Sequence, residues 1–173
     1  MKKSNITFDP FILRHNLNFM QRILIVFALF ILIASCNNSK IETTSLDLID
    51  YGISLTVNAP KTASVTQPSN SPEVWIVDST SNFEIQIRKS LSLTNDLTKV
   101  KEEELSLVKS TTGFSKIITE TDNGFIFEEN FDETSYDFRY FVVQGDHKFI
   151  FQKMFTSNLT LEDVENIFEI ISE

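Results

Sequence analysis

The feature that most limits the fold of this 173-residue chain is a series of short segments in which apolar and polar residues alternate. A period of two residues is typical of strands with one buried and one solvent-facing side. The alternation covers residues 53–57, 74–76 and 83–87, and then 116–121, 125–129, 136–142 and 148–155. Pro60 ends the first of these segments, and turn residues separate the others. We therefore expect an antiparallel meander.

One of the turns has a specific sequence. Asp122-Asn123-Gly124 lies between two alternating segments. Asn-Gly is the pair typical of a two-residue type I′ turn, because both central residues of that turn need a positive φ. The sequence predicts such a hairpin here and a second hairpin at residues 144–146, which contain Gly145.

Two segments have a helical period instead. Residues 96–109 place apolar side chains near one face, and Gly113 is expected to end that helix. Thr160 followed by Asp163 resembles a capping box, and apolar residues then recur every three or four positions up to Ile171. The order of these segments predicts an α+β fold, with an antiparallel β-sheet meander packed against two helices.

The N-terminal residues have a different composition. Residues 23–33 (ILIVFALFILI) are all apolar and follow Arg22. A helix needs about 20 apolar residues to span a bilayer, so this run is too short to do so. Its length and its basic flank are typical of a secretory signal peptide. Residues 20–36 alone form a complete signal, so Met20 is an alternative start.

The sequence Ile33-Ala34-Ser35-Cys36 resembles the lipobox of bacterial lipoproteins. The resemblance implies cleavage before Cys36 and lipidation of its sulfur, so that acyl chains attach the protein to a membrane. Each buried CH₂ group contributes roughly 0.8 kcal/mol to such an anchor. The resemblance also implies a location in the bacterial cell envelope, and Asn37 favours the outer membrane, on its periplasmic or its surface face. The alternative is a core cysteine at the end of an apolar helix.

The expected organisation has three parts: a signal peptide at residues 1–36, a flexible tether at 37–48, and a single α+β domain at 49–173. The tether is expected because its residues are polar and aperiodic. Residues 37–173 carry 11 basic and 23 acidic side chains, and this acidic surface argues against nucleic acid as a partner. The single cysteine excludes an internal disulfide and a multi-cysteine metal site.

A second resemblance concerns the domain. The sequence Gly-Ile-Ser-Leu at 52–55 leading to Pro60, the aromatic meander, and Thr-Leu-Glu-Asp at 160–163 are similar to the Mog1/PsbP-like fold over roughly residues 50–172. Small bacterial lipoproteins of unknown function share this plan. The resemblance implies a binding or accessory module rather than an enzyme, and it identifies no interface residue.

Catalytic and metal-binding patterns are weak. His147 is the one histidine after residue 36; a catalytic interpretation would pair it with Asp137 or Asp146, but no Gly-x-Ser-x-Gly motif is present. We interpret His147 as an exposed turn residue. Seven acidic residues lie between 120 and 137 without EF-hand spacing, and we interpret them as a solvated hairpin face. No catalytic residue, metal or cofactor is expected.

Aromatic residues are concentrated in the meander, and a sheet covered on one side needs only about half of them for its core. They are Phe125, Phe127, Phe131, Tyr136, Phe138, Tyr140, Phe141, Phe149, Phe151 and Phe155. At 140–143 and 149–151 the odd-numbered and the even-numbered residues are all apolar, so we expect both faces of the sheet to be covered there. If some rings are exposed instead, Phe131, Tyr136, Tyr140 and Phe141 are the candidates for a binding surface.

Together these patterns favour a lipid-anchored envelope lipoprotein that acts as a non-catalytic binding or accessory module. Its partner would be a protein or a small apolar ligand, bound through the sheet or the loops. Two alternatives remain: an envelope hydrolase with a carboxylate-based site, and a structural subunit of an outer-membrane complex.

Overall fold

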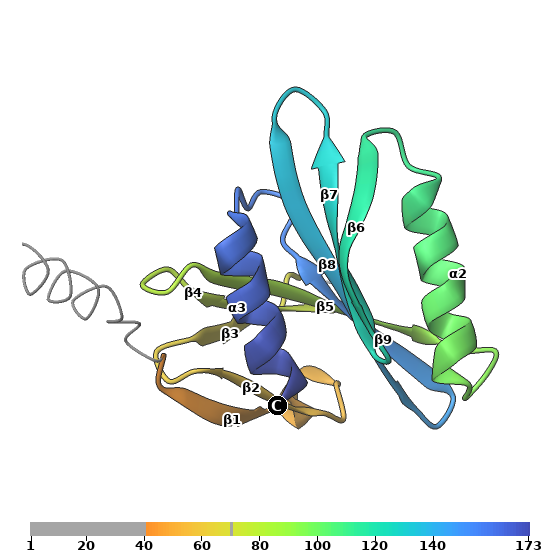
Figure 1. Ribbon diagram of the computed structural model, residues 1–173. Helices are drawn as coiled ribbons and strands as arrows, with labels where there is room; N and C mark the ends of the chain where they lie inside the picture. The colour runs from red at the N-terminus through yellow and green to blue at the C-terminus, as the bar shows by residue number, and fades with distance from the viewer. Residues whose placement is uncertain (1–40, 70) are drawn as a thin grey trace, which may run out of the picture. The chain divides into compact units, whose positions relative to one another are not determined.

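The computed structural model describes residues 41–69 and 71–173, and the predicted signal peptide, the predicted lipobox residues Ile33, Ala34 and Ser35, and Cys36 lie outside these ranges. The described residues form an α+β domain, as predicted (Figure 1). Its strands are β1 (Thr43–Asp47), β2 (Thr56–Pro60), β3 (Ser64–Thr66), β4 (Glu73–Asp78), β5 (Phe83–Leu91), β6 (Phe114–Thr121), β7 (Gly124–Asn130), β8 (Thr134–Gln144) and β9 (His147–Lys153). Its helices are the 3₁₀ turn η1 (Ile49–Tyr51) and the α-helices α2 (Leu97–Lys109) and α3 (Leu161–Ser172).

Seven of the strands form one antiparallel sheet in the order β3-β4-β5-β9-β8-β7-β6. The strands β6 to β9 follow each other as the predicted meander, and β3 to β5 form a second one. The last strand, β9, joins the two halves, since it pairs with β5 on one side and β8 on the other. This central pairing links segments that are about 60 residues apart in the chain, for example Ile87 and Phe151.

The core occupies both faces of the sheet, as the apolar runs in β8 and β9 predict. One cluster contains Phe138, Tyr140, Phe151 and the buried side chains of α3, and the strand β2 also packs there. The other cluster contains Phe141, Ile150 and the buried residues of α2. Neighbouring residues of β8 therefore point into different clusters, which explains why this strand has no polar side along residues 140–143.

The two α-helices begin at the predicted caps. The Asp96 side chain accepts hydrogen bonds from the backbone N–H groups of Thr98 and Lys99. Thr160 and Asp163 form the predicted capping box. However, α2 ends at Lys109, four residues before Gly113, so Gly113 does not end the helix as predicted.

The β6–β7 hairpin exists, but its predicted turn type is wrong. The loop consists of Asp122 and Asn123, and neither residue has a positive φ. Gly124 instead begins β7 and faces Tyr140 of β8. A Cβ atom at Gly124 would clash with the carbonyl oxygen of Arg139 and lie 3.0 Å from the Phe168 ring. The glycine is thus required for close packing rather than for turn geometry.

The predicted tether at 37–48 is wrong for its described part. Residues 43–47 form β1, which pairs with β2 through contacts such as Leu46 with Val57. Leu48 is fully buried, and Ile41 packs against the same core. The compact unit accordingly begins at Ile41 rather than at residue 49. This strand has few apolar residues of its own, and its pairing partner β2 decides its conformation.

The turn between β4 and β5 is organised by a buried carboxylate. Asp78 accepts hydrogen bonds from the hydroxyl groups of Thr62, Thr80 and Ser81 and from the backbone N–H of Thr80. Burial opposes its ionisation, but these donors together lower the pKa of Asp78 from 3.8 to about 2. The turn closes with Asn82 at φ 53°.

Candidate functional site

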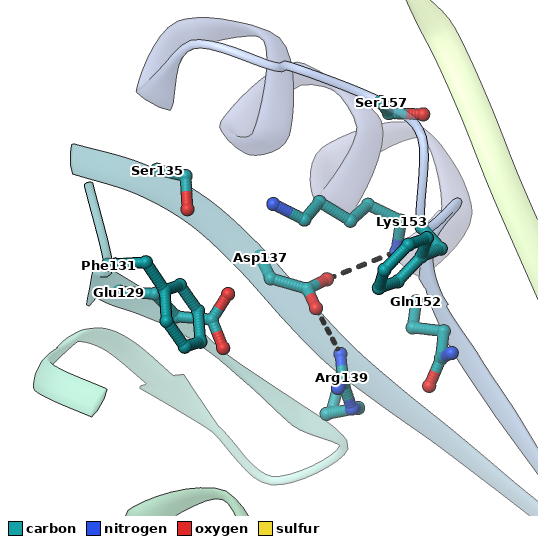
Figure 2. A pocket seen from close by; sticks show the side chains of 9 residues that line it. Glu129, Phe131, Ser135, Asp137, Arg139, Gln152, Lys153 and Ser157 are labelled. Atoms are coloured by element: carbon teal, nitrogen blue, oxygen red, sulfur yellow. Dashed lines mark hydrogen bonds and ion pairs between the residues drawn. The ribbon is translucent and has the colours of Figure 1, made fainter. Parts of the chain in front are cut away.

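A pocket of about 440 Å³ opens where β8 extends beyond the end of β9 (Figure 2). β8 pairs with β9 from Tyr140 to Gln144, whereas β9 ends at Lys153. The first residues of β8 therefore pair with β7 alone, and the side left open forms the pocket. The lining residues come from β7, β8, β9 and the segments that follow β7 and β9: Glu129, Phe131, Ser135, Asp137, Arg139, Gln152, Lys153, Phe155 and Ser157.

Asp137 organises the floor of the pocket. Its side chain is buried, and the residue is only 7% exposed. One oxygen accepts hydrogen bonds from the backbone N–H groups of Phe138, at 2.7 Å, and Lys153, at 3.1 Å. The other accepts from Arg139 Nη1 at 2.7 Å. Asp137 thus supplies Lys153 with a side-chain acceptor beyond Tyr140 and Phe151, where the backbone pairing of β8 and β9 ends.

Arg139 is fixed on several sides. Besides its ion pair with Asp137, its guanidinium donates to the carbonyl oxygen of Phe138 at 2.7 Å. The guanidinium carbon lies 5.3 Å from the centre of the Phe127 ring, within cation–π range. Asp137 and Arg139 therefore form a rigid, internally neutralised pair (Figure 2).

Glu129 is a second carboxylate in the pocket and is the last residue but one of β7. Partial burial raises the pKa of Glu129 above its ordinary value, and the negative charge of Asp137 raises it further. Lys153 and Arg139 oppose this effect without cancelling it. Among the described residues, no side chain forms an ion pair or hydrogen bond with the Glu129 carboxylate.

Lys153 is a positively charged residue that lines the same pocket. Figure 2 shows its side chain reaching back from β9 toward Ser135 and Asp137. Within residues 41–69 and 71–173, its ammonium has no carboxylate within 4.0 Å and donates no hydrogen bond. The pocket consequently contains an anion and a cation, Glu129 and Lys153, that do not neutralise each other directly.

Two phenylalanines at the pocket are exposed. Phe131 is 64% exposed and Phe155 is 98% exposed, although both are large apolar side chains. Phe131 is positioned by Gly113, where a Cβ atom would lie 2.7 Å from its ring. The backbone N–H of Asn130 also donates to the Gly113 carbonyl at 2.7 Å. The absence of a side chain at Gly113, whose φ is +96°, thus allows the Phe131 ring to pack against the backbone at this position.

The four aromatic residues predicted as a binding surface have different locations. Phe131 is exposed and lines the pocket. Tyr136 is half-buried against the core. Tyr140 is 9% exposed and Phe141 is 1% exposed, and they belong to the core clusters on opposite faces of the sheet. Tyr140 and Phe141 are therefore not surface residues, because helices cover both faces at this point.

His147 and the acidic run also differ from their predicted roles. His147 is half-buried at the start of β9, where it pairs with Leu91 and Gln144 rather than lying in a turn. Asp137 lies near the other end of these strands and is engaged by other donors. The acidic run is not one solvated face, since Glu129 and Asp137 line the pocket. Within the described ranges, no three His, Cys, Asp or Glu side chains lie close enough together to hold a metal ion.

Sequence reasoning missed most of the pocket. One signal was available: Asp137 and Arg139 are opposite charges two residues apart, and the neighbouring residues 136, 138 and 140–143 are all aromatic or apolar. In a strand this spacing places both charges on one side, where they can pair. Lys153 and Phe155 carry no comparable signal, because their position depends on where β9 ends.

Comparison of the sequence with protein-family models gives no match, and comparison with curated proteins gives none either. In the part of the chain that the structure describes, no helix is long and apolar enough to cross a membrane. The functional conclusion therefore depends on the pocket and on the N-terminal sequence pattern.

Proposed function

We propose that this protein is a lipid-anchored envelope lipoprotein whose domain is a non-catalytic binding module, with its ligand in the pocket between Glu129 and Lys153. One observation carries the proposal: two opposite charges without partners lie in a pocket rimmed by two exposed phenylalanines. Such a combination of apolar contact area and a few convergent polar groups is typical of ligand sites.

A ligand in this pocket would gain binding free energy from the apolar rings and from the unpaired charges. Burying apolar surface contributes about 25 cal/mol per Å², so covering the exposed rings of Phe131 and Phe155 favours binding. Charged groups that are partly removed from water and unpaired are unfavourable, and a ligand that pairs with them removes this cost. The Asp137–Arg139 pair contributes a rigid floor that does not need to rearrange.

The fixed state of Asp137 supports a binding role rather than a catalytic one. Its two oxygens accept hydrogen bonds from two backbone N–H groups and one guanidinium. A carboxylate that acts as a nucleophile or a base needs a free oxygen directed at the substrate. Asp137 instead connects β8 to β9.

The anchoring part of the proposal is supported by the sequence of the lipobox. Acyl chains on Cys36 would hold the domain at a membrane while the pocket faces the aqueous compartment. The residues between Cys36 and Ile41 are the whole of the connection to the folded domain, since the domain begins at Ile41.

The test is a ligand screen with the full-length protein, purified in detergent with its lipid. Metabolites and short peptides are screened for those that raise the melting temperature, and the hits are measured again on the double variant Phe131→Ala/Phe155→Ala. Leu93→Ala is the matched control, because Leu93 is fully exposed and does not line the pocket. The proposal predicts that the double variant loses the shift and the control keeps it. Equal shifts in all three proteins would contradict it.

A specific observation also favours a hydrolase as the second candidate. Glu129 has a raised pKa and lies in the same pocket as Asp137, and two carboxyl groups in one site are the arrangement that many hydrolases use. In this case Glu129 would be the proton donor. A hydrolase activity on glycosides or esters that Glu129→Gln abolishes, with Glu128→Gln as the control, would replace the binding proposal.

A further inference from the structure

We infer that the ligand of this pocket is zwitterionic, with an ammonium and a carboxylate close together on an apolar body, as in an α-amino acid or a short peptide. The inference rests on the proposed function, since it names the ligand class of the same pocket. It is carried by the two charges that have no partner, Glu129 and Lys153, and by the rings of Phe131 and Phe155.

Glu129 is the group that would receive the ammonium. It is partly buried and has no hydrogen-bond donor among the described residues, and its neighbour Asp137 is another negative charge. An ammonium placed here would pair with Glu129, whose oxygens are free acceptors, whereas Asp137 is already paired with Arg139. Charge-assisted hydrogen bonds of this kind are about twice as strong as neutral ones.

Lys153 is the group that would receive the carboxylate. Its backbone N–H is fixed on Asp137, so the start of its side chain is anchored while its ammonium remains without an acceptor. Arg139 is the other cation of the pocket lining, but its charge is already paired with Asp137, and its Nη1 also donates to the Phe138 carbonyl. Of the two lining cations, Lys153 is therefore the one without a carboxylate partner among the described residues.

The separation of these two charges is informative. Glu129 and Lys153 line one pocket, yet their charged atoms are more than 4.0 Å apart and do not form an ion pair. A ligand with only a cation would leave Lys153 unpaired in the occupied pocket, and a ligand with only an anion would leave Glu129 unpaired. A neutral ligand would leave both. A zwitterion is the one class that pairs with each of them.

The two phenylalanines determine the rest of the ligand. Phe131 and Phe155 provide the apolar surface at the pocket mouth, and the Phe131 ring packs against the backbone at Gly113. A ligand with an apolar or aromatic side chain would cover these rings. A volume of about 440 Å³ accommodates one or two amino-acid residues rather than a folded partner.

The experiment uses four probes that share one ring and differ in charge: L-phenylalanine, phenethylamine, 3-phenylpropionate and N-acetyl-phenylalaninamide. Affinities are measured by calorimetry on the full-length protein in detergent. We expect L-phenylalanine to bind about tenfold or more tightly than each of the other three, as one charge-assisted hydrogen bond predicts.

Two variants identify which side chain binds which charged group of the ligand. In Lys153→Met, L-phenylalanine and phenethylamine should bind equally, because the carboxylate has lost its partner. In Glu129→Gln, L-phenylalanine and 3-phenylpropionate should bind equally. Lys116→Met is the control, since Lys116 pairs with Glu128 outside the pocket and its loss should leave the order of the probes unchanged.

The outcomes separate this inference from the proposed function. If the neutral probe binds as tightly as L-phenylalanine, or if none of the four binds, the zwitterion inference is wrong. The proposed binding function still stands in either case if hits from the ligand screen depend on Phe131 and Phe155. If the screen gives no hit that depends on these rings, the proposed function itself is wrong.

Discussion

The replacement Asp137→Ala is the most informative single test of the structure around the pocket. The variant removes the acceptor of the Lys153 backbone N–H and leaves the Arg139 guanidinium without its carboxylate. Each lost hydrogen bond costs about 1 kcal/mol, and breaking a buried ion pair by removing one partner costs 3–5 kcal/mol. Arg139 is slightly exposed and keeps its bond to the Phe138 carbonyl, so we expect a total loss of about 2–4 kcal/mol.

The assay is urea unfolding of the purified protein, followed by the fluorescence of Trp75. Trp75 is the only tryptophan and lies on β4, so its signal reports the unfolding of the whole sheet. The control is Glu120→Ala, which removes an exposed partner of Lys101 and should cost less than about 1 kcal/mol. Asp137→Asn keeps an acceptor for Lys153 and should lose about half as much stability as Asp137→Ala.

A second substitution checks the cause. In the double variant Asp137→Ala/Arg139→Met no unpaired guanidinium remains, so it should be more stable than the sum of the two single losses predicts. Additive losses would mean that the ion pair does not exist in solution. A loss from Asp137→Ala no larger than that from Glu120→Ala would refute the conclusion that Asp137 connects β8 to β9.

Three further predictions concern other parts of the chain. The lowered pKa of Asp78 means that this carboxylate contributes roughly 2 kcal/mol to stability. The contribution is complete above its ordinary pKa of 3.8 and disappears as the pH falls toward 2, and Asp78→Asn should remove this part of the pH dependence of urea unfolding. Gly124→Ala should destabilise the protein by about 1–3 kcal/mol in the same assay, because its Cβ atom would clash with the Arg139 backbone, whereas a change of the exposed residue Ser79 to Ala should stay within about 0.5 kcal/mol. Cys36→Ala should release the protein from membranes and abolish metabolic labelling with a fatty acid; unchanged membrane retention would contradict the lipid anchor.

The local elements of the fold could be predicted because their signals are local. The capping box at Thr160 and Asp163 and the cap at Asp96 each need only neighbouring residues, and both are present. The apolar runs in β8 and β9 similarly predict a sheet covered on both faces. In contrast, β1 was not predicted, since its conformation depends on pairing with β2 and not on its own polar sequence.

The candidate site could be predicted only in small part. Of the candidates for a binding surface, Phe131 is exposed, whereas Tyr140 and Phe141 are buried, in line with the expectation that both faces of the sheet are covered at 140–143. The pocket exists because β9 ends before β8 does, and no pattern in the sequence records that difference in length. The role of Gly124 could not be predicted for a similar reason. The preceding Asn123 indicates a turn glycine, but Gly124 is required because Phe168 packs against it, and Phe168 is distant in the sequence.

The most direct test of the central claim is a crystal structure of the protein with the tightest-binding compound from the ligand screen. We predict that the compound lies between Glu129 and Lys153, with its apolar part against Phe131 and Phe155 and with the Asp137–Arg139 pair unchanged. A compound bound elsewhere on the domain, with this pocket empty, would contradict the claim that the pocket is the binding site.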